Sequence, residues 1–293
     1  MIPALHALDP NSPESLATHD ALVVVSPTPL EKHLVALSLP AVARAAIESA
    51  LAIDAALGRG ARPPVVISAS GVPGNRIVLS TVGALADDGD DVRMLAEAAA
   101  AAVSRAVEAG ARGPALFVAA PAGARYVHAR EVAALAALGT HWLPLEALEA
   151  GKRPPVLEAL GVAGLTVEQA RVLHAIETGR ALARDITGTE PERMAPLRVA
   201  EMCEAAFAGT GVKVTVTRDV TEWPLIAAVS RASMRVERHR PCVVRLEYVP
   251  EGPVSRTLYV AGKGVTYDTG GSDLKTDGSM AGMSRDKGGA GAT

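Results

Sequence analysis

The chain has 293 residues, of which 49% are hydrophobic but only 3% aromatic, so any core is aliphatic and rich in alanine. A net charge of −3 and a pI near 6.2 argue against nucleic acid or a membrane surface as the main partner. No apolar run approaches the roughly 20 residues that span a bilayer, no signal peptide is evident, and Cys203 and Cys242 are expected to be free thiols. A cytoplasmic protein is therefore expected.

The first 165 residues alternate apolar runs with alanine-rich helical segments. Residues 1–20 are polar and are interpreted as a loose lead-in. Predicted strands cover residues 21–25, 65–67, 76–80 and 115–120, and predicted helices cover residues 40–58, 92–109 and 128–138. Because strands alternate with helices, residues 1–165 are predicted to form a three-layer α/β domain with a partly parallel sheet.

A second domain is predicted over residues 166–293. Residues 149–165 are rich in proline and glycine and are interpreted as an inter-domain linker or its flank. The sequence Thr166-Val-Glu-Gln169 has the pattern of a capping box and predicts the start of a helix. That helix is predicted to end near residue 185, and a second helix is predicted over residues 197–208. Strands are predicted at residues 213–217, 241–248 and 257–261.

Residues 260–293, at the end of the chain, carry glycine pairs with lysines and aspartates between them. Asp268 and Asp286 are hard oxygen ligands, and two converging carboxylates would repel each other unless a cation lay between them. Of Lys263 and Lys275, one could act as a desolvated amine ligand and the other could stabilise an oxyanion. A phosphate-binding glycine loop stays open as an alternative, although neither G-x-x-x-x-G-K-[ST] nor G-x-G-x-x-G occurs here.

These segments resemble the leucine aminopeptidase (cytosol aminopeptidase, M17) family of metallopeptidases. The matching residues are Gly262-Lys-Gly-Val-Thr-Tyr-Asp-Thr-Gly-Gly271, Lys275 and Met283-Ser-Arg-Asp-Lys-Gly-Gly289. Upstream segments such as Pro191-Glu-Arg-Met-Ala-Pro196 extend the resemblance over about residues 175–293. The N-terminal half agrees in layout with the macro-like α/β domain of these enzymes, so residues 166–293 are expected to be the first part of an M17-type catalytic domain.

The resemblance implies a role for each of four residues. Lys263 would be an amine ligand of the more tightly held metal, Asp268 would bridge two metals, and Asp286 would complete the tight site. Lys275 would stay charged, polarise the scissile carbonyl and stabilise the tetrahedral intermediate. The implied cofactors are two divalent ions, Zn²⁺ or Mn²⁺ with Mg²⁺ as an alternative, in a two-metal hydrolysis of peptides.

The family's second signature, Asn-Thr-Asp-Ala-Glu-Gly-Arg, does not occur in these 293 residues. In the family its acidic residues supply the remaining ligands and its arginine holds a bicarbonate. Residues 1–293 alone are therefore expected to be inactive, whereas the intact hexameric enzyme would release N-terminal residues, with a leucine-like preference as one option. The alternative is a non-catalytic binding or assembly module related to the family.

Overall fold

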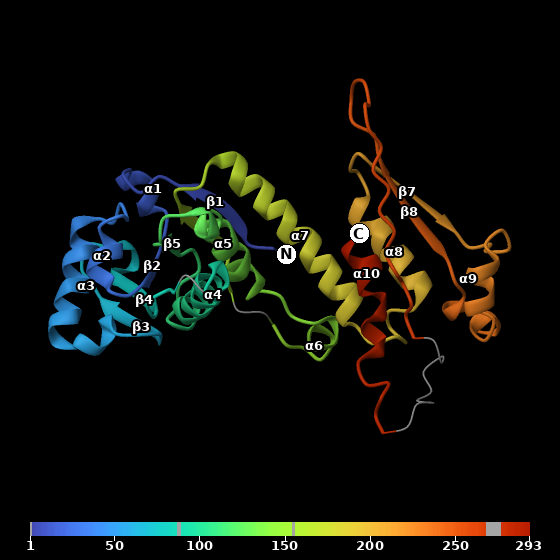
Figure 1. Cartoon of the computed structure of the whole chain (residues 1–293), viewed down its shortest axis with the longest axis horizontal. Helices are drawn as coiled ribbons and strands as arrows, with labels where there is room; N and C mark the ends of the chain where they lie inside the picture. The colour runs from blue at the N-terminus through green and yellow to red at the C-terminus, as the bar shows by residue number, and fades with distance from the viewer. Residues whose placement is uncertain (1, 87–88, 154–155, 268–276) are drawn as a thin grey trace. The chain divides into compact units, whose positions relative to one another are not determined.

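A computed structural model describes residues 2–86, 89–153, 156–267 and 277–293 of the chain (Figure 1). The chain forms two compact units. The first comprises Met1–Leu143 and Arg153–Thr178, and the second comprises Pro144–Lys152 and Gly179–Thr293. This division falls inside a helix, α7 (Val167–Gly188). The predicted domain boundary between residues 165 and 166 stays a prediction.

The first unit is built on a six-stranded sheet of order β1-β6-β5-β2-β4-β3. Its neighbouring strands are parallel except for β3, which pairs antiparallel with β4. The prediction of a partly parallel sheet is therefore confirmed. The strands are β1 (Ala4–Leu8), β2 (Leu22–Pro27), β3 (Arg62–Ser68), β4 (Arg76–Val82), β5 (Ala115–Val118) and β6 (Ala159–Ala163).

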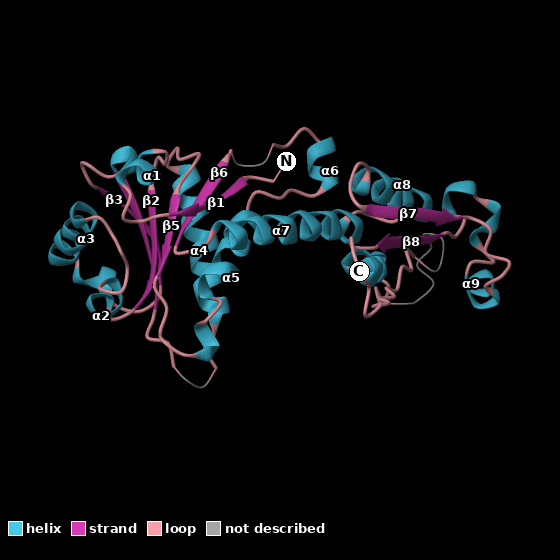
Figure 2. Cartoon of the chain, turned by 90° about the horizontal axis from the view of Figure 1, so that it is seen from above, coloured by secondary structure: helices cyan, strands magenta, loops and turns pink. Residues whose placement is uncertain are grey.

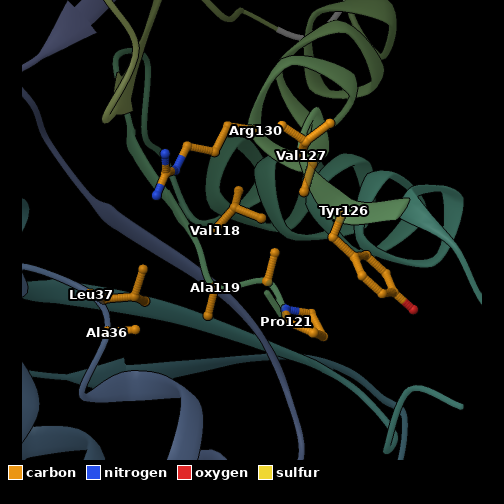
Figure 3. Close-up of a pocket in the computed structure, with 10 residues that line it drawn as sticks. Ala36, Leu37, Val118, Ala119, Pro121, Tyr126, Val127 and Arg130 are labelled. Atoms are coloured by element: carbon orange, nitrogen blue, oxygen red, sulfur yellow. The ribbon is translucent and has the colours of Figure 1, made fainter. Parts of the chain in front are cut away.

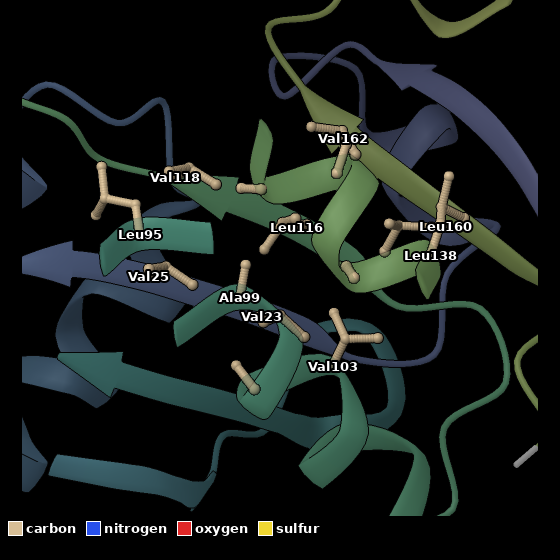
Figure 4. Packing of buried hydrophobic residues seen from close by; sticks show 14 of the residues in the cluster. Val23, Val25, Leu95, Ala99, Val103, Leu116, Val118, Leu138, Leu160 and Val162 are labelled. Carbon is tan, nitrogen blue, oxygen red and sulfur yellow. The ribbon is translucent and has the colours of Figure 1, made fainter. Parts of the chain in front are cut away.

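Alternating side chains of β2 pack into two separate hydrophobic cores, one on each face of the sheet. Val23 and Val25 pack on the face covered by α4 (Val92–Glu108) and α5 (Ala129–Gly139), as Figure 4 shows. Leu22 and Val24 pack on the opposite face. Each of these four side chains is fully buried, which contributes about 1.5–3 kcal/mol per residue.

Helices cover both faces of the sheet. The face opposite α4 and α5 carries three further helices, as Figure 2 shows for α2 and α3. These helices are α1 (Pro13–Ala17), α2 (Leu30–Leu34) and α3 (Ala41–Ile53). The predicted three-layer arrangement is therefore confirmed. Its physical reason is that each face of the sheet must bury its apolar side chains.

Two strands were not expected from the sequence. Residues 1–20 are not a loose lead-in, because β1 pairs in parallel with β6 from Ala4↔Ala159 to Leu8↔Ala163. The segment 149–165 is likewise more than a linker, since its β6 lies between β1 and β5 in the sheet. Each strand has only five residues, and the partner of β1 lies about 155 residues along the chain, so neither leaves a strong local pattern.

The second unit combines short helices with a two-stranded antiparallel sheet, β7 (Val212–Thr217) and β8 (Val243–Tyr248). Ile186, Met194 and Cys203 form its buried apolar cluster. Its other elements include α6 (Leu145–Glu149), α8 (Pro196–Phe207), α9 (Pro224–Val229), the 3₁₀ helix η6 (Met283–Lys287) and α10 (Gly288–Ala292). Among the described helices, none combines the length and apolarity needed to cross a bilayer.

The predicted strand at residues 257–261 is wrong. These residues adopt no regular secondary structure, and Leu258 and Tyr259 are 85% and 87% exposed. A strand needs a neighbour for its backbone hydrogen bonds. Within the described part of the chain, β7 and β8 pair only with each other, so the apolar run 257–261 has no ladder to join.

Candidate functional site

The structure describes two of the four predicted site residues. Lys263 lies on the irregular segment 261–267, and Asp286 lies in η6. Asp268 and Lys275 lie outside the described residues, so their predicted roles stay predictions. Both described residues belong to the second unit.

The segment that carries Lys263 contacts the backbone of α10. The amide of Ala290 donates a hydrogen bond to the carbonyl oxygen of Lys263 at 2.8 Å. A Cβ atom on Gly262 would lie 2.4 Å from the carbonyl oxygen of Gly289 and 2.6 Å from the Cα of Ala290. Only glycine permits such an approach of two backbones, which explains why a glycine precedes Lys263.

Lys263 and Asp286 meet although 23 residues separate them in sequence. The Lys263 Nζ atom lies 2.8 Å from Asp286 Oδ2, and the two side chains are 61% and 46% exposed. As an exposed ion pair this contact contributes little stability. Its value is geometric, because it brings one nitrogen and one oxygen donor together at an accessible surface.

This donor pair fits a divalent ion in its chemistry. Nitrogen and carboxylate oxygen both bind zinc at about 2.0–2.2 Å, so two adjacent ligands of a tetrahedral ion lie about 3.4 Å apart. The 2.8 Å between Lys263 Nζ and Asp286 Oδ2 is the length of a hydrogen-bonded ion pair, and a small movement with loss of the lysine proton would let both atoms bind one ion. The described residues contain no group of three or more His, Cys, Asp or Glu that could hold a metal, so further ligands would have to come from elsewhere.

Lys287 is a functional candidate that the sequence analysis did not single out. Its side chain is buried, with 1% of its surface exposed. Its Nζ atom donates a hydrogen bond to the carbonyl oxygen of Thr189 at 2.8 Å and another to the carbonyl oxygen of Ser284. Burial lowers the pKa of the Lys287 ammonium, and the nearby carboxylates of Glu190 and Glu146 act in the opposite direction. In the sequence, the only indication of a role for Lys287 was its position directly after Asp286.

The turn that receives Lys287 is itself held by hydrogen bonds. The Glu190 amide donates to Glu146 Oε1 at 2.9 Å, and the Glu190 carboxylate accepts from the amides of Glu192 and Arg193 at 2.7 and 2.9 Å. Thr189 is buried, and its hydroxyl donates to the carbonyl oxygen of Asp185 at 2.6 Å. The carbonyl of Thr189 is therefore a fixed acceptor for Lys287.

A separate cavity of about 160 Å³ occurs in the first unit, at the carboxyl end of β5. Val118, Ala119 and Pro121 line it together with Tyr126 and Arg130, and Figure 3 shows the last two pointing to opposite sides. Ligands of open α/β sheets bind at such strand ends, but pockets for small molecules usually measure about 300–1,000 Å³. This cavity contains none of the predicted site residues.

Residues 181–293 match the catalytic domain of the cytosol aminopeptidase family. A putative aminopeptidase of Caenorhabditis elegans is 41% identical over 231 residues, which cover 76% of this chain and 44% of that protein. A probable cytosol aminopeptidase of Micrococcus luteus is 33% identical over 287 residues, which cover 93% of this chain and 54% of that protein. The chain thus spans about half the length of these relatives.

Solved structures show the same fold. A leucyl aminopeptidase from Leishmania major in complex with actinonin superposes with a TM-score of 0.70 at 22% identity, over 99% of this chain and 56% of that one. The bottromycin maturation enzyme BotP in complex with Mn superposes with a TM-score of 0.65 at 23% identity, over 93% of this chain and 54% of that one. From the match of residues 181–293 and the identity to these relatives, the chain belongs to the cytosol aminopeptidase family.

Proposed function

We propose that this chain contributes to the active site of a two-metal aminopeptidase that releases N-terminal residues from peptides. The observation that carries the proposal is the 2.8 Å approach of Lys263 Nζ to Asp286 Oδ2. Both residues lie in the region that matches the family's catalytic domain. The contact brings together one residue from the segment 262–271 and one from the segment 283–289, as a shared metal site requires.

In this proposal Lys263, Asp268 and Asp286 would hold the two metal ions. The chemistry of amine and carboxylate donors fits Zn²⁺ or Mn²⁺, with Mg²⁺ as the alternative. Mn in the BotP complex supports manganese as a candidate. When bound, a pair of such ions polarises the scissile carbonyl and activates water as a nucleophile.

The other catalytic and structural roles are assigned to residues of the protein and to a bicarbonate. Lys275 would stay protonated and donate hydrogen bonds to the oxygen of the scissile carbonyl as its negative charge develops. Gly262 would let the Lys263 segment approach α10 closely enough for Lys263 to reach Asp286. A bicarbonate held by another part of the intact enzyme would serve as the general base.

The names of the relatives support the other parts of the proposal. Several are called cytosol aminopeptidases, which supports a cytoplasmic location and a peptide substrate. Leucine-like residues are candidates for the preferred N-terminal residue of the substrate. A homo-hexamer is the proposed assembly.

Hydrolysis of leucine p-nitroanilide by the full-length protein, supplied with Mn²⁺ or Zn²⁺, tests this function. Lys275→Ala should lower kcat by about 10²–10³-fold, because one donor to the developing oxyanion is lost, and should change KM less. Residues 1–293 alone are expected to be inactive. A full-length protein that shows no metal-dependent hydrolysis would contradict the proposal, and activity in residues 1–293 alone would overturn the second expectation.

The non-catalytic alternative has one observation in its favour. Leu225, Leu258 and Tyr259 are large apolar side chains that are more than 80% exposed in the second unit. Exposed apolar surface is typical of segments that bind another protein. A full-length protein that assembles but hydrolyses nothing with any of the three ions would favour this binding or assembly module.

A further inference from the structure

We propose that Lys287 is a positioning residue for the metal site, and that its buried side chain fixes the segment that carries Asp286. This inference rests on the proposed function, because it concerns how one of the proposed ligands is held. It assigns a role to a lysine that neither binds the metal nor touches the substrate in that function.

The Lys287 side chain joins two places in the second unit. One hydrogen bond reaches the carbonyl oxygen of Thr189, 98 residues earlier in the chain, at 2.8 Å. The other reaches the carbonyl oxygen of Ser284, in the same 3₁₀ turn as Asp286. A single ammonium therefore closes the turn that contains Asp286 and attaches that turn to the segment after α7.

Asp286 is also connected to the segment that carries Lys263. Ala290, four residues further on, donates its amide to the carbonyl oxygen of Lys263 at 2.8 Å. Lys263 in turn places its Nζ atom 2.8 Å from Asp286 Oδ2. Asp286 is thus connected through Lys287 to the carbonyl of Thr189, and through Lys263 to the backbone of Ala290. Partners that orient ligands in this way commonly change metal affinity when they are removed.

The chemistry of the buried position supports a specific role. An ammonium that is only 1% exposed is costly to bury, and an apolar side chain of similar length would avoid that cost. Lysine is useful here because it donates up to three hydrogen bonds, and two go to backbone carbonyls that methionine cannot satisfy. The carboxylates of Glu190 and Glu146 lie near enough to compensate its charge.

Mn²⁺ binding to the full-length protein tests the inference, with free Mn²⁺ measured by electron paramagnetic resonance. Lys287→Met should raise the Kd for Mn²⁺ by about 10–100-fold, as expected when a residue that orients a ligand is lost. Lys287→Arg, which keeps the charge and the donors, should recover most of the affinity. Lys213→Met, the same change at an exposed lysine of β7, is the matched control and should bind as the wild type does.

The outcomes separate this inference from the proposed function. If the wild type binds no Mn²⁺, or Asp286→Asn binds it equally well, the proposed function fails. If Asp286→Asn loses the ion while Lys287→Met binds it as tightly as Lys213→Met, only the role of Lys287 is overturned. Equal losses in Lys287→Met and Lys287→Arg would also overturn it, because they would point to packing alone.

Hydrogen exchange in the metal-free wild type keeps the inference testable if Lys287→Met does not fold. The inference requires residues 283–290 to be held before any metal arrives. Their amides, and that of Ala290 above all, should then exchange more slowly than those of an unfolded peptide. Exchange at the unfolded rate throughout this segment would overturn the inference.

Discussion

Gly262 passes so close to residues 289 and 290 that a methyl group does not fit. Gly262→Ala would place Cβ 2.4 Å from a backbone oxygen that cannot rotate away, so the Lys263 segment must shift. We expect a loss of about 1–3 kcal/mol in the free energy of unfolding, as for other overpacked sites, together with weaker Mn²⁺ binding. Urea denaturation and metal titration measure the two effects.

Gly211→Ala is the matched control for Gly262→Ala. The added Cβ would lie 3.5 Å from the ring of Tyr248, which is an ordinary van der Waals distance. This variant should retain wild-type Mn²⁺ affinity. Equal behaviour of the two variants would contradict the close backbone approach at Gly262.

His19 makes the stability of the first unit depend on pH. Burial lowers its pKa below the usual 6.5, although a hydrogen bond between Nδ1 and the carbonyl oxygen of Gly113 at 2.9 Å acts in the opposite direction. The unfolded chain therefore binds the proton more readily than the folded one. The stability from neutral His19 is fully present above pH 6.5 and is lost as the pH falls through and below that value.

The free energy of unfolding, measured between pH 8 and pH 5, tests this effect of His19. The wild type should lose more stability over this range than His19→Gln, which has no proton to gain. The difference between the two proteins should therefore change with pH. A difference that stays constant from pH 8 to pH 5 would show that His19 is not held in its neutral form.

Residue types alone predicted Lys263 and Asp286 as site candidates, because amines and carboxylates among glycines suit a cation. The structure brings these two together. Lys287 could not be recognised in the same way. Its importance depends on a carbonyl 98 residues earlier, and no local pattern in the sequence records that contact.

At the scale of elements, the capping-box sequence was sufficient to predict where α7 begins. The Thr166 amide donates to Gln169 Oε1 at 2.8 Å, and the Gln169 amide donates to Thr166 Oγ1 at 3.1 Å, as a capping box requires. Thr166→Ala should lower the free energy of unfolding by about 1 kcal/mol. Chemical denaturation measures this loss.

Thr178→Ala makes the same chemical change inside α7 and serves as its control. The Thr178 hydroxyl donates only to the carbonyl oxygen of His174 within the helix. Alanine is the better helix former, so this variant should be neutral or slightly stabilised. A Thr166→Ala variant as stable as Thr178→Ala would contradict the contribution of the capping box.

Long-range pairing explains which strands the sequence predicted. Strands β2 and β5 are interior strands whose residues are all buried, so they appear as continuous apolar runs. β1 and β6 are short, and their strand character depends on each other's backbone. The run 257–261 shows the reverse case, because its composition favours a strand but the described structure gives it no partner.

At the scale of the whole molecule, the candidate functional residues lie in only one of the two compact units. The first unit provides a three-layer fold and a small cavity, and the second contains Lys263, Asp286 and Lys287. The family match, over residues 181–293, lies entirely in the second unit. We therefore propose that Lys263 and Asp286, both in the second unit, hold the same divalent ion.

Isothermal titration of the full-length protein with Mn²⁺ tests that claim most directly. The wild type should bind two ions, and Asp286→Asn should lose the tighter one because a neutral amide is a weaker ligand than a carboxylate. Asp277→Asn is the matched control, since Asp277 has a φ of 61° that asparagine also tolerates. We expect tight binding in the wild type and in Asp277→Asn but not in Asp286→Asn. Unchanged affinity and stoichiometry in Asp286→Asn would contradict it.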